Sequence, residues 1–253
     1  MTGELHPAFF AAAIPAAVLI GVSKSGFGGS VSLLSVPLLA LVISPAKAAA
    51  IMLPMLILAD LIGLWVFRNS VDWRNIKIML PGAVLGVALG ALTFRITSDT
   101  LLRGMLGIMC LAFVLQQTVL SKHQPQPKQP DPVKGGILGT FSGFTSFIAN
   151  AGGPPFLIYM APQKLDRILF AGTATVFFAC INFIKLGPFI WLGLFNATNL
   201  NATLILLPAG LVGYFLGLKV LVRIDGKTFY RVIHAALFVT GLKLLWEVLG
   251  AIG

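Results

Sequence analysis

Long apolar stretches alternate with short polar ones along the whole chain, and they form two groups of five. The first group covers residues 7–22, 30–43, 45–67, 76–94 and 100–119. The second covers residues 133–147, 154–160, 168–191, 200–222 and 227–249. A helix needs about 20 residues to cross a bilayer. Three stretches in each group are therefore long enough to span a membrane, and the first two of each group are short or marginal.

The two groups repeat the same proline and glycine positions. The segment Leu80, Pro81, Gly86 and Gly90 recurs in the same order as Leu207, Pro208, Gly213 and Gly217, which gives LPxxxxGxxxG in both halves. Internal duplication of this kind is common in transporter folds. We predict two membrane repeats, residues 1–120 and 133–253, joined by a polar cytoplasmic linker at 121–132.

Basic residues predict that the two repeats have opposite orientations. The loop after the third stretch carries Arg68, Arg74 and Lys77, whereas its counterpart at 192–200 has no charge. The next loop reverses this contrast, because its basic residues are concentrated in the second half. By the positive-inside rule the repeats are inverted and both termini lie outside. Each half then needs an odd number of crossings. Three long transmembrane helices plus a short broken or re-entrant helical hairpin satisfy this requirement, and so do five full crossings. The short segment 154–160 favours the hairpin.

The composition agrees with an all-α polytopic membrane protein. Apolar residues make up 57% of the chain and charged residues 10%, and the mean hydropathy is +0.94. A soluble domain has about 25% charged residues, so a soluble enzyme and a nucleic-acid binder are disfavoured. In a membrane protein a net charge of +10 indicates basic residues that keep cytoplasmic loops on their side of the membrane. Nucleotide-binding and protease motifs are absent, and Cys110 and Cys180 lie in apolar runs. We therefore predict no catalytic residue, no metal site and no cofactor.

Two glycine-rich segments are the candidate substrate-binding tips of the hairpins. The first contributes Ser23, Lys24, Ser25, Gly26, Gly28, Gly29 and Ser30, and the second contributes Asn150, Gly152 and Gly153. Each tip leads into a helix start, where glycines allow backbone N–H groups to approach a ligand and the helix dipole favours an anion. The alternative is that these glycines only end helices at a packed bend.

Few ionisable residues fall inside the predicted spans, and such residues are functional candidates because they are costly in hydrocarbon. Asp60 is the candidate for proton coupling or for pairing with Lys24, with a purely structural hydrogen bond as the alternative. Lys185 and Asn182 lie at a comparable place in the second half. Lys243 and Glu247 are four residues apart, so we expect an ordinary pair on one helix face.

These residues carry a resemblance to a known family. Residues 21–29 (GVSKSGFGG), Pro37, the Val71-Asp72-Trp73 loop and the repeated LPxxxxGxxxG helix resemble the sulfite exporter TauE/SafE family, within the toluene-sulfonate uptake permease group. The resemblance covers nearly the whole chain. It implies a multi-pass permease of the cell inner membrane whose partners are the lipid bilayer and a small anionic substrate, such as sulfite or an organosulfonate.

We therefore expect a secondary transporter, an exporter of small sulfur-containing anions, that works by alternating access around a mid-membrane anion site. A passive anion channel and a permease for another organic anion are the alternatives. A monomer and a homodimer are both open.

Overall fold

The computed structural model describes residues 6–24, 31–119, 127–223 and 226–252, and this part of the chain is helical without strands. The first half contains α1 (Pro7–Lys24), a 3-10 turn (Val31–Leu34), α2 (Ser35–Ala40), α3 (Pro45–Val66), α4 (Trp73–Ile96) and α5 (Asp99–Val119). The second half contains α6 (Pro132–Ala149), α7 (Gly153–Met160), a 3-10 turn (Ala161–Gln163), α8 (Arg167–Trp191), α9 (Ala197–Arg223) and α10 (Gly226–Ile252).

Seven of the described helices are long and apolar enough to cross a membrane, namely α1, α3, α4, α5, α8, α9 and α10. This confirms the prediction of an all-α polytopic membrane protein. The first half has one more such helix than expected, because α1 continues through Ser23 and Lys24 and reaches 18 residues. The helices α2 and α7, with six and eight residues, are too short to span.

Side-chain caps fix where several helices begin. Asp72, Asp131 and Asp166 precede α4, α6 and α8, and each carboxylate accepts hydrogen bonds from backbone N–H groups of the first turn. Ser44 caps α3 in the same way. These groups have no partner inside the helix, so the caps satisfy donors that would otherwise be left open. Three of the acidic residues are thereby accounted for at helix ends, outside the apolar segments.

The glycines of the repeated motif allow close helix packing in both halves. A Cβ atom at Gly86 of α4 would lie 2.0 Å from the carbonyl oxygen of Thr140 on α6. A Cβ atom at Gly213 of α9 would lie 2.3 Å from the carbonyl oxygen of Val18 on α1. The pairs α4 with α6 and α1 with α9 are the most extensive helix contacts in the described chain. Small residues permit such backbone approach in membrane proteins.

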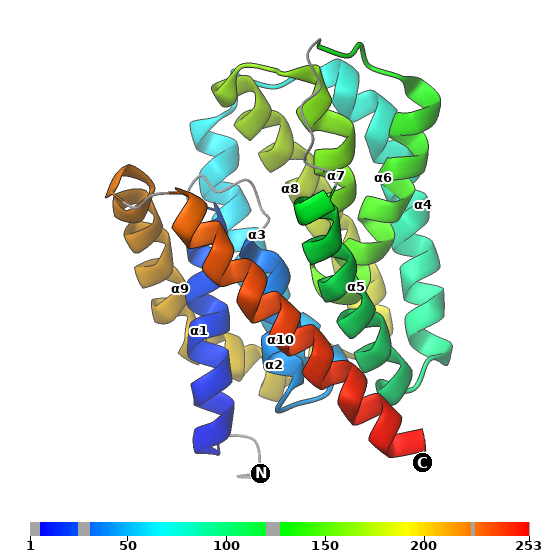
Figure 1. The fold of residues 1–253 in the computed structure, drawn as a ribbon, viewed down its shortest axis with the longest axis vertical. Coiled ribbons are helices and arrows are strands. Elements are labelled where there is room, and N and C mark those ends of the chain that lie inside the picture. Colours follow the sequence, from blue (N-terminus) through cyan, green and yellow to red (C-terminus); the bar gives the residue numbers. More distant parts are fainter. Residues whose placement is uncertain (1–5, 25–30, 120–126, 224–225, 253) are drawn as a thin grey trace.

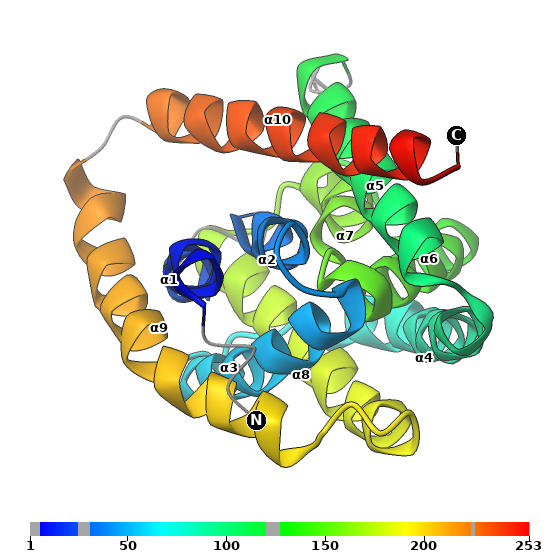
Figure 2. The same ribbon diagram turned by 90° about the horizontal axis from the view of Figure 1, so that it is seen from below.

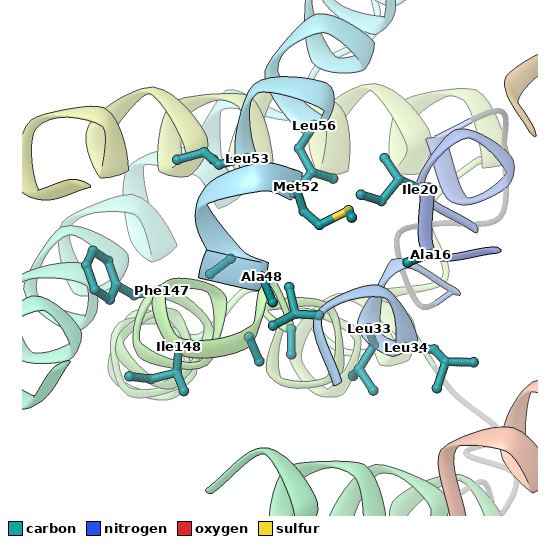
Figure 3. Packing of buried hydrophobic residues seen from close by; sticks show 14 of the residues in the cluster. Ala16, Ile20, Leu33, Leu34, Ala48, Met52, Leu53, Leu56, Phe147 and Ile148 are labelled. Carbon is teal, nitrogen blue, oxygen red and sulfur yellow. The ribbon is translucent and has the colours of Figure 1, made fainter. Parts of the chain in front are cut away.

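The helices form one bundle, with α1 beginning and α10 ending at the same end and α6 beginning at the opposite end (Figure 1). In the end-on view α9 and α10 lie at the outside of the bundle, and α1 and α2 lie on their inner side (Figure 2). Buried apolar side chains of α1, the 3-10 turn before α2, α3 and α6 belong to one core cluster, part of which is shown in Figure 3.

Both short helices are anchored at the end remote from the predicted tips. Arg103 of α5 donates to the carbonyl oxygen of Ala40 at the end of α2, and to that of Ile43 at 3.0 Å. Glu247 of α10 pairs with Arg103 at 3.2 Å. The expected pair of Glu247 with Lys243 is therefore replaced by a salt bridge between helices, because α5 and α10 pack together.

The far end of α7 is held by side-chain hydrogen bonds to α4. Gln163, which follows α7, exchanges two hydrogen bonds with Asn75 of α4, at 2.9 and 3.1 Å. Asn75 is in turn hydrogen-bonded to the cap residue Asp72 at 2.8 Å. The far end of α2 is thus held by α5, which is paired with α10. The far end of α7 is held by α4.

The close packing of α4 and α6 predicts a sharp contrast between two glycines of α6. A Cβ atom at Gly143 would lie 2.0 Å from the carbonyl oxygen of Ala83, whereas one at Gly136 would have no atom within 4 Å. We expect Gly143→Ala to destabilise the protein by about 1–3 kcal/mol through overpacking. Gly136→Ala should be neutral or slightly stabilising, because alanine favours helix. Thermal unfolding in detergent measures both, and equal melting temperatures for the two variants would contradict this packing.

Candidate anion site

The centre of the site is an ion pair inside the bundle. Lys24, the last residue of α1, donates to Oδ1 of Asp60 on α3. Asp60 is fully buried, and its Oδ2 accepts a hydrogen bond of 2.6 Å from the Asn182 side chain on α8. A charge in an apolar interior needs a partner of this kind. The pair therefore ties α1, α3 and α8 together at one point.

A second lysine lies one helical turn further along α8. Lys185 is fully buried, and its ammonium group donates to Oδ1 of Asn150 at 2.6 Å. It also donates to the carbonyl oxygen and the hydroxyl of Ser146, at 3.1 and 3.2 Å. Among the described residues these partners are all neutral. Because residues three apart share a helix face, Asn182 and Lys185 connect the two parts of the cluster.

The cluster has one more basic side chain than acidic side chains. Within the described residues it contains two lysines and one aspartate. A buried charge without a counterion is costly, and the hydrogen bonds from Lys185 to neutral groups offset only part of this cost. An anion placed between the lysines would supply the missing charge.

Two buried polar groups beside the lysines have no hydrogen-bond partner among the residues that the structure describes: the hydroxyl of Ser23 and the amide nitrogen of Asn150. Ser23 is 1% exposed and Asn150 is 8% exposed. Buried polar groups are nearly always paired, so such exceptions often mark a ligand or water site. Both groups can donate a hydrogen bond to an anion.

The position of Asn150 follows from how α6 ends. Its backbone is left-handed, with φ 52°, and its N–H donates to the carbonyl oxygen of Ser146. Asparagine adopts this conformation more readily than most residues. The turn directs Oδ1 to Lys185. The amide nitrogen therefore remains available on the other side of the group.

A cavity of about 20 Å³ adjoins these groups, with Lys24, Ser146, Asn150, Gly153 and Asn182 in its lining. Gly153 begins α7, so the start of this helix faces the same space. A cavity of about 10–15 Å³ is enough for one water molecule. In this conformation the space next to the cluster therefore takes about one water.

Four residues of the predicted site meet in this cluster: Lys24, Asp60, Asn150 and Gly153. Ser23 lies next to them, with its hydroxyl unpaired. Gly152 has a packing role, since a Cβ atom there would lie 2.8 Å from the carbonyl oxygen of Ser142. The remaining predicted residues, Ser25, Gly26, Gly28, Gly29 and Ser30, lie outside the described part of the chain.

The sequence interpretation left three members of the cluster out of the site: Ser146, Asn182 and Lys185. The signal for Ser146 was its spacing, since it precedes Asn150 by one helical turn. Lys185 and Asn182 are polar residues within a span, at a place comparable to Asp60, and this correspondence could have assigned them to the same site.

A sequence model of a known family matches residues 13–244, and its description is "Sulfite exporter TauE/SafE". The chain belongs to the sulfite exporter TauE/SafE family. Members of this family are membrane transporters and not enzymes, which agrees with the expectation of a transporter. The matched range contains every residue of the cluster. Searches of curated proteins and of solved structures gave no match.

In this TauE/SafE protein the Lys24–Asp60 pair should show strong energetic coupling. Removal of one partner of a buried pair costs about 3–5 kcal/mol, because the other charge is left unpaired. We expect Asp60→Asn to lower the melting temperature markedly, and the double variant Lys24→Met/Asp60→Asn to recover part of the loss. Unfolding of both single variants and the double variant gives the coupling energy. A double variant whose loss equals the sum of the single losses would show that the pair is not coupled.

Proposed function

We propose that the protein is a secondary transporter that exports small sulfur-containing anions, such as sulfite or an organosulfonate. Membership of the TauE/SafE family supports transport of sulfur anions in general. The observation that carries the proposal is the buried cluster with two lysines and one aspartate, next to the unpaired donors of Ser23 and Asn150. It has the charge and the hydrogen-bond donors that an oxyanion requires.

In the proposed bound state the oxyanion lies between Lys24 and Asn150. The Lys24 ammonium, the Ser23 hydroxyl and the Asn150 amide nitrogen donate to its oxygens, and the start of α7 at Gly153 favours its charge. Lys185 holds Asn150 in place through Oδ1 and adds positive charge behind it.

The architecture supports an inverted repeat. In that arrangement α1 to α5 correspond to α6 to α10, so the contact of α4 with α6 corresponds to that of α9 with α1. Both contacts occur and are extensive. The helices α3 and α8, which carry Asp60 and Lys185, also contact each other, and they are counterparts in the two halves. Rocking of the halves at this contact would change access to the anion.

The small size of the cavity supports alternating access over a continuously open channel. The cavity next to Lys24 and Asn150 takes about one water, which is smaller than a hydrated anion. The exposed basic residues Arg68, Arg74 and Lys77 follow α3. In Figure 1, α3 ends on the side of the bundle where α6 begins, opposite to the start of α1 and the end of α10. This supports an orientation in the cell inner membrane with both termini outside.

Asp60 is the proposed proton-coupling residue. Its carboxylate and the substrate anion compete for Lys24, so protonation of Asp60 frees Lys24 for the anion. Export itself is favoured by the interior-negative membrane potential, which drives an anion outward.

A thermal-shift panel tests the site directly. Sulfite, sulfate, phosphate, acetate and chloride are compared at matched ionic strength on detergent-purified protein. A ligand at 100 times its Kd stabilises the folded state by about 2.7 kcal/mol, and we expect such stabilisation from sulfite. Asn150→Asp should abolish it, because the substitution replaces the free donor by an acidic oxygen and cancels the excess charge. The fold should be kept, because Oδ1 still accepts from Lys185.

The matched control is Lys134→Met, which removes a positive charge from an exposed position of α6. It should retain the full sulfite shift. An undiminished shift in Asn150→Asp would contradict the proposed site.

The role of Asp60 is tested with methanesulfonate binding at a single pH. Asp60→Asn removes the carboxylate that competes with the substrate anion for Lys24, so we expect the folded variant to bind methanesulfonate more tightly than the wild type. An affinity equal to or below that of the wild type would contradict the competition.

A further inference from the structure

A cavity of about 280 Å³ lies between the end of α1 and the start of α8. Its lining includes Ser23 and Lys24 of α1, Phe67 after α3, and Arg167, the first residue of α8. Lys24 and Phe178 also line the small cavity of the cluster. The large cavity, called the vestibule below, therefore adjoins the proposed anion site.

The vestibule reaches from the surface to the ion pair. Arg167 is exposed, whereas Ser23 is 1% exposed and Asp60 is fully buried. The Lys24 side chain, which lies between these extremes, keeps an exposure of 13%. A cavity of this volume holds several water molecules, so an anion can enter it with part of its hydration shell. In the described conformation an anion can therefore approach Lys24 along the vestibule.

The start of α8 is fixed beside the basic loop that follows α3. A Cβ atom at Gly172 of α8 would lie 1.9 Å from the carbonyl oxygen of Ser70 in this loop. The backbone N–H of Asp72 donates to the Thr173 hydroxyl at 2.9 Å. The vestibule thus opens at the end of the bundle that carries this loop. In the proposed orientation it is the cytoplasmic end.

The opposite end of the bundle, where α2 ends, is tightly packed. Leu39 and Ala40 of α2 are fully buried. Arg103 donates to the carbonyl oxygens of Ala40 and Ile43, so the end of α2 is tied to α5. Among the described residues, the cluster is thus approached from the end with the basic loop, and the end with α2 is closed by side chains.

Arg167 gives the outer part of the vestibule a positive charge. It has no ion pair among the residues that the structure describes. The carboxylate of the neighbouring Asp166 accepts hydrogen bonds from the backbone N–H groups of Ile168 and Leu169 and thus caps α8. A cation in a cleft with low-dielectric walls, such as the one that Phe170 provides here, raises the local concentration of anions.

We propose that the vestibule is the cytoplasmic entrance of the transporter and that Arg167 captures the anion there before it reaches Lys24. The inference rests on the proposed function, because it assigns the route by which the same anion site is filled. Arg167 acts on the first encounter, whereas Lys24 and Ser23 hold the anion at the end of the route. Arg167 therefore selects for negative charge and not for a particular anion.

Thiol modification tests this route without any transport. Ala171→Cys, in the vestibule lining, is introduced together with Cys110→Ala and Cys180→Ala. Inside-out membrane vesicles are treated with two impermeant methanethiosulfonate reagents, one anionic and one cationic, and each rate is divided by the rate with a small thiol in solution. We expect modification from this face, with the anionic reagent favoured by about tenfold at low ionic strength and less at high ionic strength. Right-side-out vesicles should show no modification.

The anionic preference should depend on the charge at position 167. Arg167→Gln should abolish it, and Arg167→Lys should keep it. The matched control is Lys134→Met, which removes an exposed positive charge outside the vestibule lining and should also keep the preference. In proteoliposomes, Arg167→Gln should raise KM for sulfite about three- to tenfold with kcat unchanged, because only the encounter step is weakened. Ala174→Cys repeats the modification test deeper in the vestibule, at a residue with 6% exposure.

Absence of modification from the inside-out face would overturn the inference. Modification from the outer face would do so as well, and so would normalised rates that do not change in Arg167→Gln. These readouts do not require sulfite, so the two proposals fail separately. If the preference depends on Arg167 but sulfite does not bind, the proposed function fails. If sulfite binds and the preference is missing, only the entrance proposal fails.

Discussion

The structure depends on the need to compensate charge in a low-dielectric interior. Lys24, Asp60 and Lys185 are buried or nearly so, and each would be costly without partners. Their partners come from four helices, α1, α3, α6 and α8, so the positions of these helices are fixed together. Within the described residues the cluster has two basic groups and one acidic group, and the donors of Ser23 and Asn150 beside it have no partner. The proposed anion site rests on this combination.

Close helix packing makes this arrangement stable. The glycines of α4, α6 and α9 bring backbones together where a single methyl group would clash, and this places the ends of α1 and α6 next to each other inside the bundle. The short helices are held at their far ends by Arg103 and by Asn75. Polar groups at the far ends of the short helices are thus satisfied, whereas the donors of Ser23 and Asn150 have no partner among the described residues. The substrate is proposed to bind beside these two donors.

Much of the architecture could be predicted from the sequence, because span length and apolar composition depend on the local chain. The short helix α7 follows from this. The pair Lys24–Asp60 was one of the roles predicted for Asp60, because an ionisable residue within a span needs a partner. The contribution of Lys185 could not be derived in the same way, because its partners Ser146 and Asn150 lie on another helix and only tertiary packing brings them together. Glu247 shows the same limit: a local rule pairs it with Lys243, and helix packing gives it Arg103 instead.

The buried cluster of Lys24, Asp60 and Lys185 is proposed to bind the transported anion. Counterflow measures this: proteoliposomes loaded with unlabelled sulfite are placed in a trace of radiolabelled sulfite. We expect a transient accumulation of label above equilibrium with the wild-type protein and with Lys134→Met, and none with correctly folded Lys185→Met. Wild-type liposomes without an overshoot, or Lys185→Met liposomes with the wild-type overshoot, would contradict it.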